Sequence, residues 1–102
     1  MKTPEGYEKA EIKKYLTSIG AFHFSPTMAG YGRSGVPDIV ACIGGRFWGI
    51  EVKREGKKPT PRQWKMMAEI NEAGGASLCG TAAVVIRGLQ NIDYDGGYEQ
   101  SM

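Results

Sequence analysis

The sequence predicts one α/β domain with the element order helix, strand, strand, strand, helix, strand. Two apolar stripes with helical spacing, within residues 12–19 and 64–70, flank runs of β-branched and aromatic residues at 37–43 and 47–53. A length of 102 residues leaves room for a single domain. The 41% hydrophobic and 24% charged fractions are ordinary for a folded globular chain.

The first helix is predicted to begin at Pro4 and to end at Gly20. Thr3 is a suitable N-cap, proline suits the first helical position, and Glu5 complements the positive end of the helix dipole. The apolar stripe consists of Ile12, Tyr15, Leu16 and Ile19. When this stripe is extended backwards, Glu5 and Glu8 lie near its line.

Three strands are predicted to follow the first helix. They cover residues 21–24, 37–43 and 47–53. Gly44 and Gly45 predict a hairpin turn between the second and third strands. Because side chains alternate along a strand, Glu51 and Lys53 point to one face while Trp48, Ile50 and Val52 point to the other.

The second helix is predicted to begin after Thr60, which has capping-box spacing to Gln63 around Pro61. Its buried side is expected to consist of Trp64, Met67 and Ile70, and the Gly74–Gly75 pair ends it. Residues 76–86 are predicted to form a strand broken near Gly80, with 82–86 as its clearer part. We expect the domain to cover residues 1–90 and the polar residues 91–102 to form a frayed tail.

Several classes of protein are disfavoured by composition. Cys42 and Cys79 have no partner at zinc-ligand spacing and are expected to be small core residues, and His23 is the sole histidine. No apolar run approaches the roughly 18–20 residues that span a bilayer, and residues 1–5 lack the apolar region of a signal peptide. We therefore expect a cytoplasmic protein.

Positive charge is concentrated in one segment. Residues 1–90 contain all 13 lysine and arginine residues but only 8 of the 11 acidic ones. The densest cluster, opposed only by Glu55, consists of Lys53, Arg54, Lys57, Lys58, Arg62 and Lys65. Such a cluster suits a polyanion such as a nucleic-acid backbone, although charge runs are also common in solvated loops.

Three polar residues are predicted to converge at one end of the hairpin. Asp38 stands where a buried strand begins, and Glu51 and Lys53 share one face of the next strand. Two carboxylates at close range repel each other unless a cation lies between them, and their hard oxygen ligands suit Mg²⁺ or Mn²⁺. The alternative interpretation is a surface salt bridge between Glu51 and Lys53.

The pattern Pro37-Asp38 followed by Glu51-Val52-Lys53 resembles the PD-(D/E)xK nuclease superfamily. The flanking segments 30–40, 45–53 and 58–63 resemble a stand-alone VRR-NUC (virus-type replication-repair nuclease) domain of the phage type, over roughly residues 4–86. This resemblance implies a restriction-endonuclease-like core, in which helices flank a mixed β-sheet.

The resemblance also implies a set of metal ligands. Asp38, Glu51 and the backbone carbonyl of Val52 would hold Mg²⁺ or Mn²⁺, and Lys53 would position the nucleophile. These nucleases also use a glutamate of the first helix, for which Glu5 is the better match.

Two residues of this resemblance have competing interpretations. Glu8 is the rival of Glu5 as the catalytic glutamate, since it also lies near the apolar stripe. Gln63 matches the glutamine that opens the second helix near the active site of these nucleases, but it is also explained as a capping-box residue.

The glycine-rich segment 30–35 fits the G-x-G-x-x-G pattern of a dinucleotide site. It leads into a strand rather than a helix, so we expect no nucleotide cofactor. The segment is expected to approach DNA or to serve as a flexible connection. The predicted DNA-binding residues are Tyr31, Arg33, Ser34, Arg54, Lys57, Lys58 and Arg62.

The function implied by this resemblance is metal-dependent endonuclease cleavage of branched DNA. A C2 homodimer would match the symmetry of a four-way (Holliday) junction. The alternatives are a flap-cutting or less selective DNA nuclease with the same chemistry, and a DNA-binding module without catalysis on the same fold.

Overall fold

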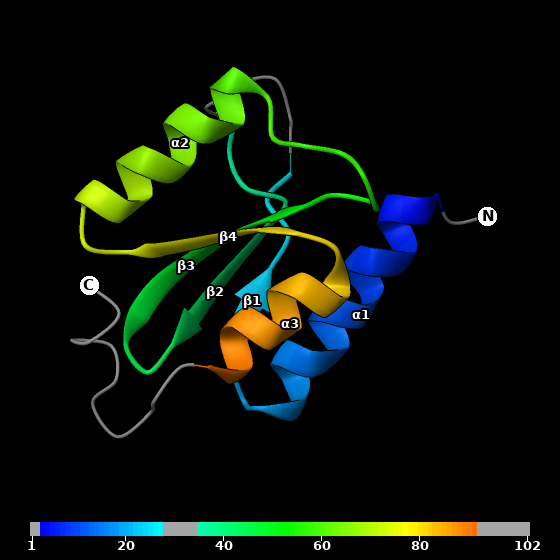
Figure 1. Cartoon of the computed structure of the whole chain (residues 1–102). Helices are drawn as coiled ribbons and strands as arrows, with labels where there is room; N and C mark the ends of the chain where they lie inside the picture. The colour runs from blue at the N-terminus through cyan, green and yellow to red at the C-terminus, as the bar shows by residue number, and fades with distance from the viewer. Residues whose placement is uncertain (1–2, 28–34, 92–102) are drawn as a thin grey trace.

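The computed structural model describes residues 3–27 and 35–91, which form a four-stranded sheet with α2 on one face and α1 and α3 on the other (Figure 1). The elements are α1 (Pro4–Ser18), β1 (Phe22–Phe24), β2 (Ile39–Ile43), β3 (Arg46–Val52), α2 (Pro61–Glu72), β4 (Ala76–Gly80) and α3 (Ala82–Gln90). The predicted frayed tail lies, from residue 92 onwards, outside the described residues.

The sheet is mixed and has the strand order β1-β2-β3-β4. The first three strands are antiparallel, and β3 and β4 are parallel, joined by the crossover helix α2. The predicted hairpin turn is confirmed, because Gly44 and Gly45 have φ angles of 59° and 83°, in the left-handed region that favours glycine. The predicted fold class, a mixed sheet flanked by helices, is thus confirmed.

The predicted caps of the first two helices are also confirmed. The Thr3 side chain accepts a hydrogen bond from the Gly6 backbone N–H at 3.0 Å. In α2, the Thr60 hydroxyl accepts from the Gln63 N–H, and the Gln63 side-chain oxygen accepts from the Thr60 N–H at 2.9 Å. This reciprocal pair is the capping box predicted from the sequence.

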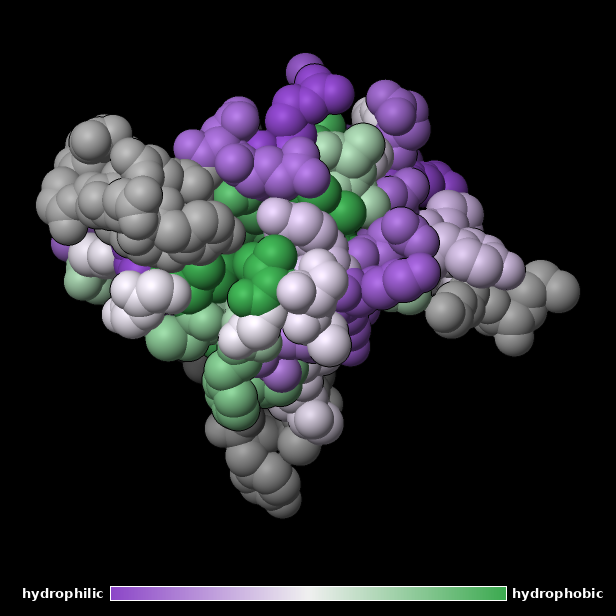
Figure 2. Space-filling model, turned by 90° about the horizontal axis from the view of Figure 1, so that it is seen from below, coloured by the Kyte–Doolittle hydropathy of each residue, from purple (hydrophilic) through white to green (hydrophobic). Residues whose placement is uncertain are grey.

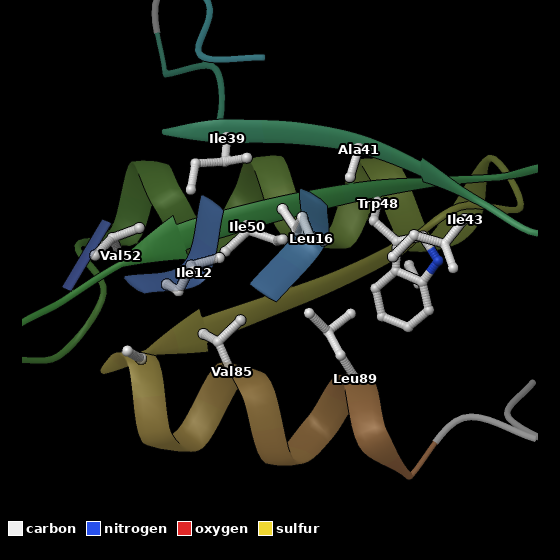
Figure 3. Close-up of a cluster of buried hydrophobic side chains, with 12 residues drawn as sticks. Ile12, Leu16, Ile39, Ala41, Ile43, Trp48, Ile50, Val52, Val85 and Leu89 are labelled. Carbon is white, nitrogen blue, oxygen red and sulfur yellow. The ribbon is translucent and has the colours of Figure 1, made fainter. Parts of the chain in front are cut away.

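The main core lies between the sheet and the α1–α3 layer (Figure 3). The sheet contributes alternate residues, including Ile39, Ile50 and Val52, and these meet apolar side chains of both helices. The helix residues with no exposed surface are Ile12, Leu16, Val85 and Leu89. Seen from below, hydrophobic residues gather at the centre of the surface, and hydrophilic residues lie above them and to their right (Figure 2).

The prediction of a strand over residues 76–86 is correct for 76–80 and wrong for 82–86, which belong to α3. Gly80, at φ 148°, ends β4, and the Thr81 side chain caps the new helix by accepting from the Val84 N–H. The buried residues Ala82, Val85 and Leu89 have helical spacing, and a helix buries all three against α1 and β4. This burial outweighs the β propensity of the valine run.

Two predictions about buried side chains are also wrong. Trp64, predicted to be buried, is 60% exposed, whereas the predicted Met67 is buried together with Met66, and Ile70 is half-buried. Cys42 is exposed on the sheet face opposite the main core, and Cys79 is half-buried.

Among the described residues, no helix has the length and apolar character needed to cross a membrane.

Candidate active site

Asp38 and Glu51 lie next to each other on neighbouring strands. Ile39 pairs with Ile50, so continuing the antiparallel register by one residue places Asp38 opposite Glu51. The Asp38 Oδ2 atom accepts a hydrogen bond of 2.9 Å from the Val52 backbone N–H, which ties the start of β2 to the end of β3. The predicted convergence of these two carboxyl groups is therefore present.

The backbone of β3 allows this close approach because residue 49 is a glycine. A Cβ atom at Gly49 would lie 2.9 Å from the Pro37 side chain and 2.6 Å from that of Ile70. Pro37 is buried and directly precedes Asp38. The absence of a side chain at position 49 thus lets the Pro37-Asp38 segment pack between β3 and α2.

Glu51 is a buried carboxyl group without full compensation. It is 2% exposed, and its Oε2 atom has no hydrogen-bond partner among the described residues. Three effects raise the pKa of Glu51 from 4.5 to about 8. The largest is burial, the next is the hydrogen bond to Asp38, and the third is the negative charge of Asp38. A buried carboxyl group with a strongly raised pKa is more typical of a functional site than of an exposed salt bridge.

Two lysines oppose this rise in the pKa of Glu51. The positive charges of Lys53 and Lys9 both favour the ionised carboxylate. Lys53 follows Glu51 by two residues, directly after the end of β3, and is half-buried. Lys9 belongs to α1 and was not predicted from the sequence, although it lies one helical turn after Glu5 on the same side of that helix.

Cys79 is a second neighbour that the sequence did not indicate. It pairs with Glu51 in the parallel register of β3 and β4. Burial, and then the negative charge of Glu51, raises the pKa of the Cys79 thiol. Asp38, Glu51 and Cys79 therefore form one row across three strands, a relation that becomes visible only with the register of β4.

The two candidate glutamates of α1 differ in their contacts. The Glu8 Oε1 atom accepts a hydrogen bond of 2.7 Å from the Ala82 backbone N–H, at the start of α3. Within residues 3–27 and 35–91, no three acidic, histidine or cysteine side chains lie close enough together to hold a metal ion. Asp38 and Glu51 thus lie together as a pair. The role of Glu5 as a further metal ligand remains a prediction.

This difference predicts distinct effects for two substitutions. Glu8→Ala should lower the free energy of unfolding by about 1–2 kcal/mol, because the Ala82 N–H loses its charged acceptor. Glu5→Ala should change stability by less than about 1 kcal/mol and should slow DNA cleavage. Urea denaturation and a cleavage assay of both variants test this. A stable but inactive Glu8→Ala protein would reverse the assignment.

The remaining predicted site residues are placed as follows. Gln63 is half-buried and fulfils its capping role, and its part in catalysis stays a prediction. Arg54, Lys57, Lys58 and Arg62 are all exposed, as a surface for a polyanion requires. Tyr31, Arg33 and Ser34 lie outside the described residues.

The residues of this site fit a divalent cation. The unpaired oxygen of Glu51 and the adjacent carboxyl group of Asp38 offer hard oxygen ligands, which Mg²⁺ and Mn²⁺ prefer. A cation between them would offset the burial and the negative charge of Asp38, which together favour the protonated form of Glu51 at neutral pH. We therefore regard Asp38 and Glu51 as the centre of a candidate metal site.

The fold and this row of side chains define a restriction-endonuclease-like domain with the PD-(D/E)xK pattern. A solved structure described as "VRR_NUC domain" matches the chain with a TM-score of 0.77 and 25% sequence identity, covering 90% of this chain and all of that one. The resemblance to VRR-NUC domains read from the sequence is thereby confirmed, while the phage type remains a prediction. No family model and no curated protein matches the sequence.

Proposed function

We propose that this protein is a metal-dependent DNA endonuclease that cuts branched DNA, with the four-way junction as its preferred substrate and a homodimer as its active form. The observation that carries this proposal is the buried Glu51 carboxyl group next to the half-buried Asp38 and beside Lys53, on a VRR-NUC fold. A binding module without catalysis has no need for two adjacent carboxyl groups facing a polyanion, because they repel phosphate.

Each group of the site has a role in this proposal. Asp38, Glu51 and the Val52 carbonyl would hold Mg²⁺ or Mn²⁺, with Glu5 as a further ligand. Such an ion lowers the pKa of water and polarises the scissile phosphate. Lys53 orients the attacking water and offsets the negative charge that develops on the phosphate. Lys9, whose charge also acts on Glu51, adds to the positive potential there.

The exposed cations next to the site would hold the DNA backbone. Arg54, Lys57 and Lys58 lie in the segment between β3 and α2, and Arg62 lies in the first turn of α2. This segment begins two residues after Glu51, so a duplex bound along it would pass the carboxyl pair. We therefore assign these residues to sequence-independent phosphate contacts.

A gel assay with labelled four-way junction, flap and linear duplex tests the function. We expect symmetrical junction cleavage in Mg²⁺ or Mn²⁺, none in chelator, and none with Asp38→Asn, which keeps an oxygen acceptor for the Val52 N–H. Lys53→Ala should reduce the rate roughly 10²–10⁴-fold, whereas Lys14→Ala, which removes an exposed charge from α1, should not.

The other outcomes of this assay separate the alternatives. Equal cutting of all three substrates would retain the nuclease and remove the junction preference. Binding without cutting in either metal would support the DNA-binding module. Sedimentation of the protein alone tests the homodimer, and a monomer that still resolves junctions would contradict that part of the proposal.

A further inference from the structure

Trp64 is a large aromatic side chain exposed beside the proposed active site. It is 60% exposed, whereas the other tryptophan, Trp48, is 4% exposed in the core. Leaving a tryptophan on the surface forgoes a large apolar burial. Since α2 already buries Met66 and Met67 against the rest of the fold, Trp64 is not needed for its packing.

Trp64 forms one wall of a groove between α2 and β4. The groove has a volume of about 490 Å³, and its apolar lining includes Met67, Ala68 and Leu78. This volume is within the range of sites that hold small flat molecules. A hydrogen bond of 3.1 Å from the Ser77 hydroxyl to the Asn71 Oδ1 atom adds a polar part to the lining.

The groove reaches β4, the strand next to the one that carries Glu51. Cys79 lines the groove and is also the register partner of Glu51 on β3. A molecule that fills the groove therefore lies one strand away from the residues that would perform the cleavage.

The charges of α2 are divided along its length. Arg62 and Lys65, both exposed, lie within two residues of Trp64 in the first half, and Glu69 and Glu72 lie in the second half. A polyanion with flat apolar groups complements an exposed aromatic ring on the cationic half of a helix, because its phosphates can meet the cations while a base meets the ring. This combination favours nucleic acid over an apolar peptide.

We propose that the groove holds an unpaired nucleobase of the DNA substrate, stacked on the indole ring of Trp64, while Arg62 and Lys65 contact the adjoining phosphates. Paired bases inside a duplex have no free face, so the contact is open only to unpaired or unstacked nucleotides. This inference rests on the proposed nuclease function and assigns to Trp64 a role in selecting DNA with unpaired nucleotides over fully paired duplex.

Binding in chelator tests the inference separately from cleavage. We expect Trp64→Ala to bind a junction that carries unpaired nucleotides about 5- to 100-fold more weakly, as the loss of one stacked base implies. Affinity for linear duplex should not change, and Trp64→Phe should restore most of the loss. The matched control is Phe22→Ala, which removes an exposed aromatic ring from β1 at the other edge of the sheet.

A second measurement identifies the partner of the ring. Trp64 is the exposed indole, so stacking of a base should quench its fluorescence, and Trp64→Phe should remove this signal. Replacing the unpaired nucleotide with an abasic one should weaken binding to the parent protein but not to Trp64→Ala, because the two changes remove the same contact.

Four results would overturn the inference. The first is an equal loss of affinity for duplex and for unpaired substrates, and the second is additivity of the abasic and Trp64→Ala effects. The third is a change in oligomeric state with unchanged DNA binding, which would assign the groove to a second copy of the chain. Normal Trp64→Ala binding together with metal-dependent cleavage would reject this inference and keep the nuclease.

Discussion

Replacement of Glu51 with glutamine is expected to slow DNA cleavage by at least about 10³-fold while leaving the protein folded. Glutamine has the shape of glutamate and fits the same buried position, but it removes the charge that would hold a cation. Because the carboxyl group keeps its proton up to about pH 8 in the absence of a cation, a neutral side chain is compatible with the fold.

The matched control for this variant is Glu11→Gln, an identical chemical change at an exposed position of α1. Cleavage rates, circular dichroism and thermal unfolding should be recorded for both proteins. A Glu51→Gln protein that cuts the junction at the parental rate would remove Glu51 from the catalytic site, and with it the basis of the proposed chemistry.

The second large effect is a decrease in the stability of the metal-free protein with rising pH. The folded state raises the pKa of Glu51 above that of the unfolded chain, from 4.5 to about 8. Between these values only the folded state retains the proton, so unfolding releases it and becomes easier as pH rises. The contribution is fully present below pH 4.5 and is lost on passing pH 8.

Comparison with Glu51→Gln isolates this contribution, because the other titrating groups are common to both proteins. Between pH 5 and 9 the parent should lose roughly 2–5 kcal/mol of unfolding free energy relative to the variant. Mn²⁺ or Mg²⁺ should restore part of this loss above pH 8 in the parent only, since a cation binds the ionised carboxylate. A constant difference between the two proteins would contradict the raised pKa.

Much of the fold could be predicted from the sequence because local signals agree with tertiary packing. Threonine caps followed by proline define the starts of α1 and α2, and the Gly44–Gly45 turn sets the register of β2 and β3. Once that register is known, the strand alternation alone brings Asp38 and Glu51 together. The motif of Asp38 followed by Glu51-Val52-Lys53 could be recognised because the spacing between its two acidic residues follows from the geometry of the hairpin.

The features that could not be predicted depend on contacts between distant segments. The run Ala82 to Ile86 has β propensity, and its helical form follows from the Thr81 cap and from packing against α1. The exposure of Trp64 reflects how little of α2 the sheet covers, since β4 is the edge strand. The neighbours Lys9 and Cys79 approach Glu51 only after α1 and β4 are in place.

The position of β3 has a consequence for how activity responds to heat. This strand carries Glu51 and ends directly before Lys53, and from Trp48 to Ile50 it is paired with a strand on both sides. Its amide hydrogens should exchange with solvent only through global opening of the fold, more slowly than those at the edge strand β1. Heat inactivation should therefore coincide with whole-domain melting, with no milder temperature at which the strand that carries Glu51 alone loosens.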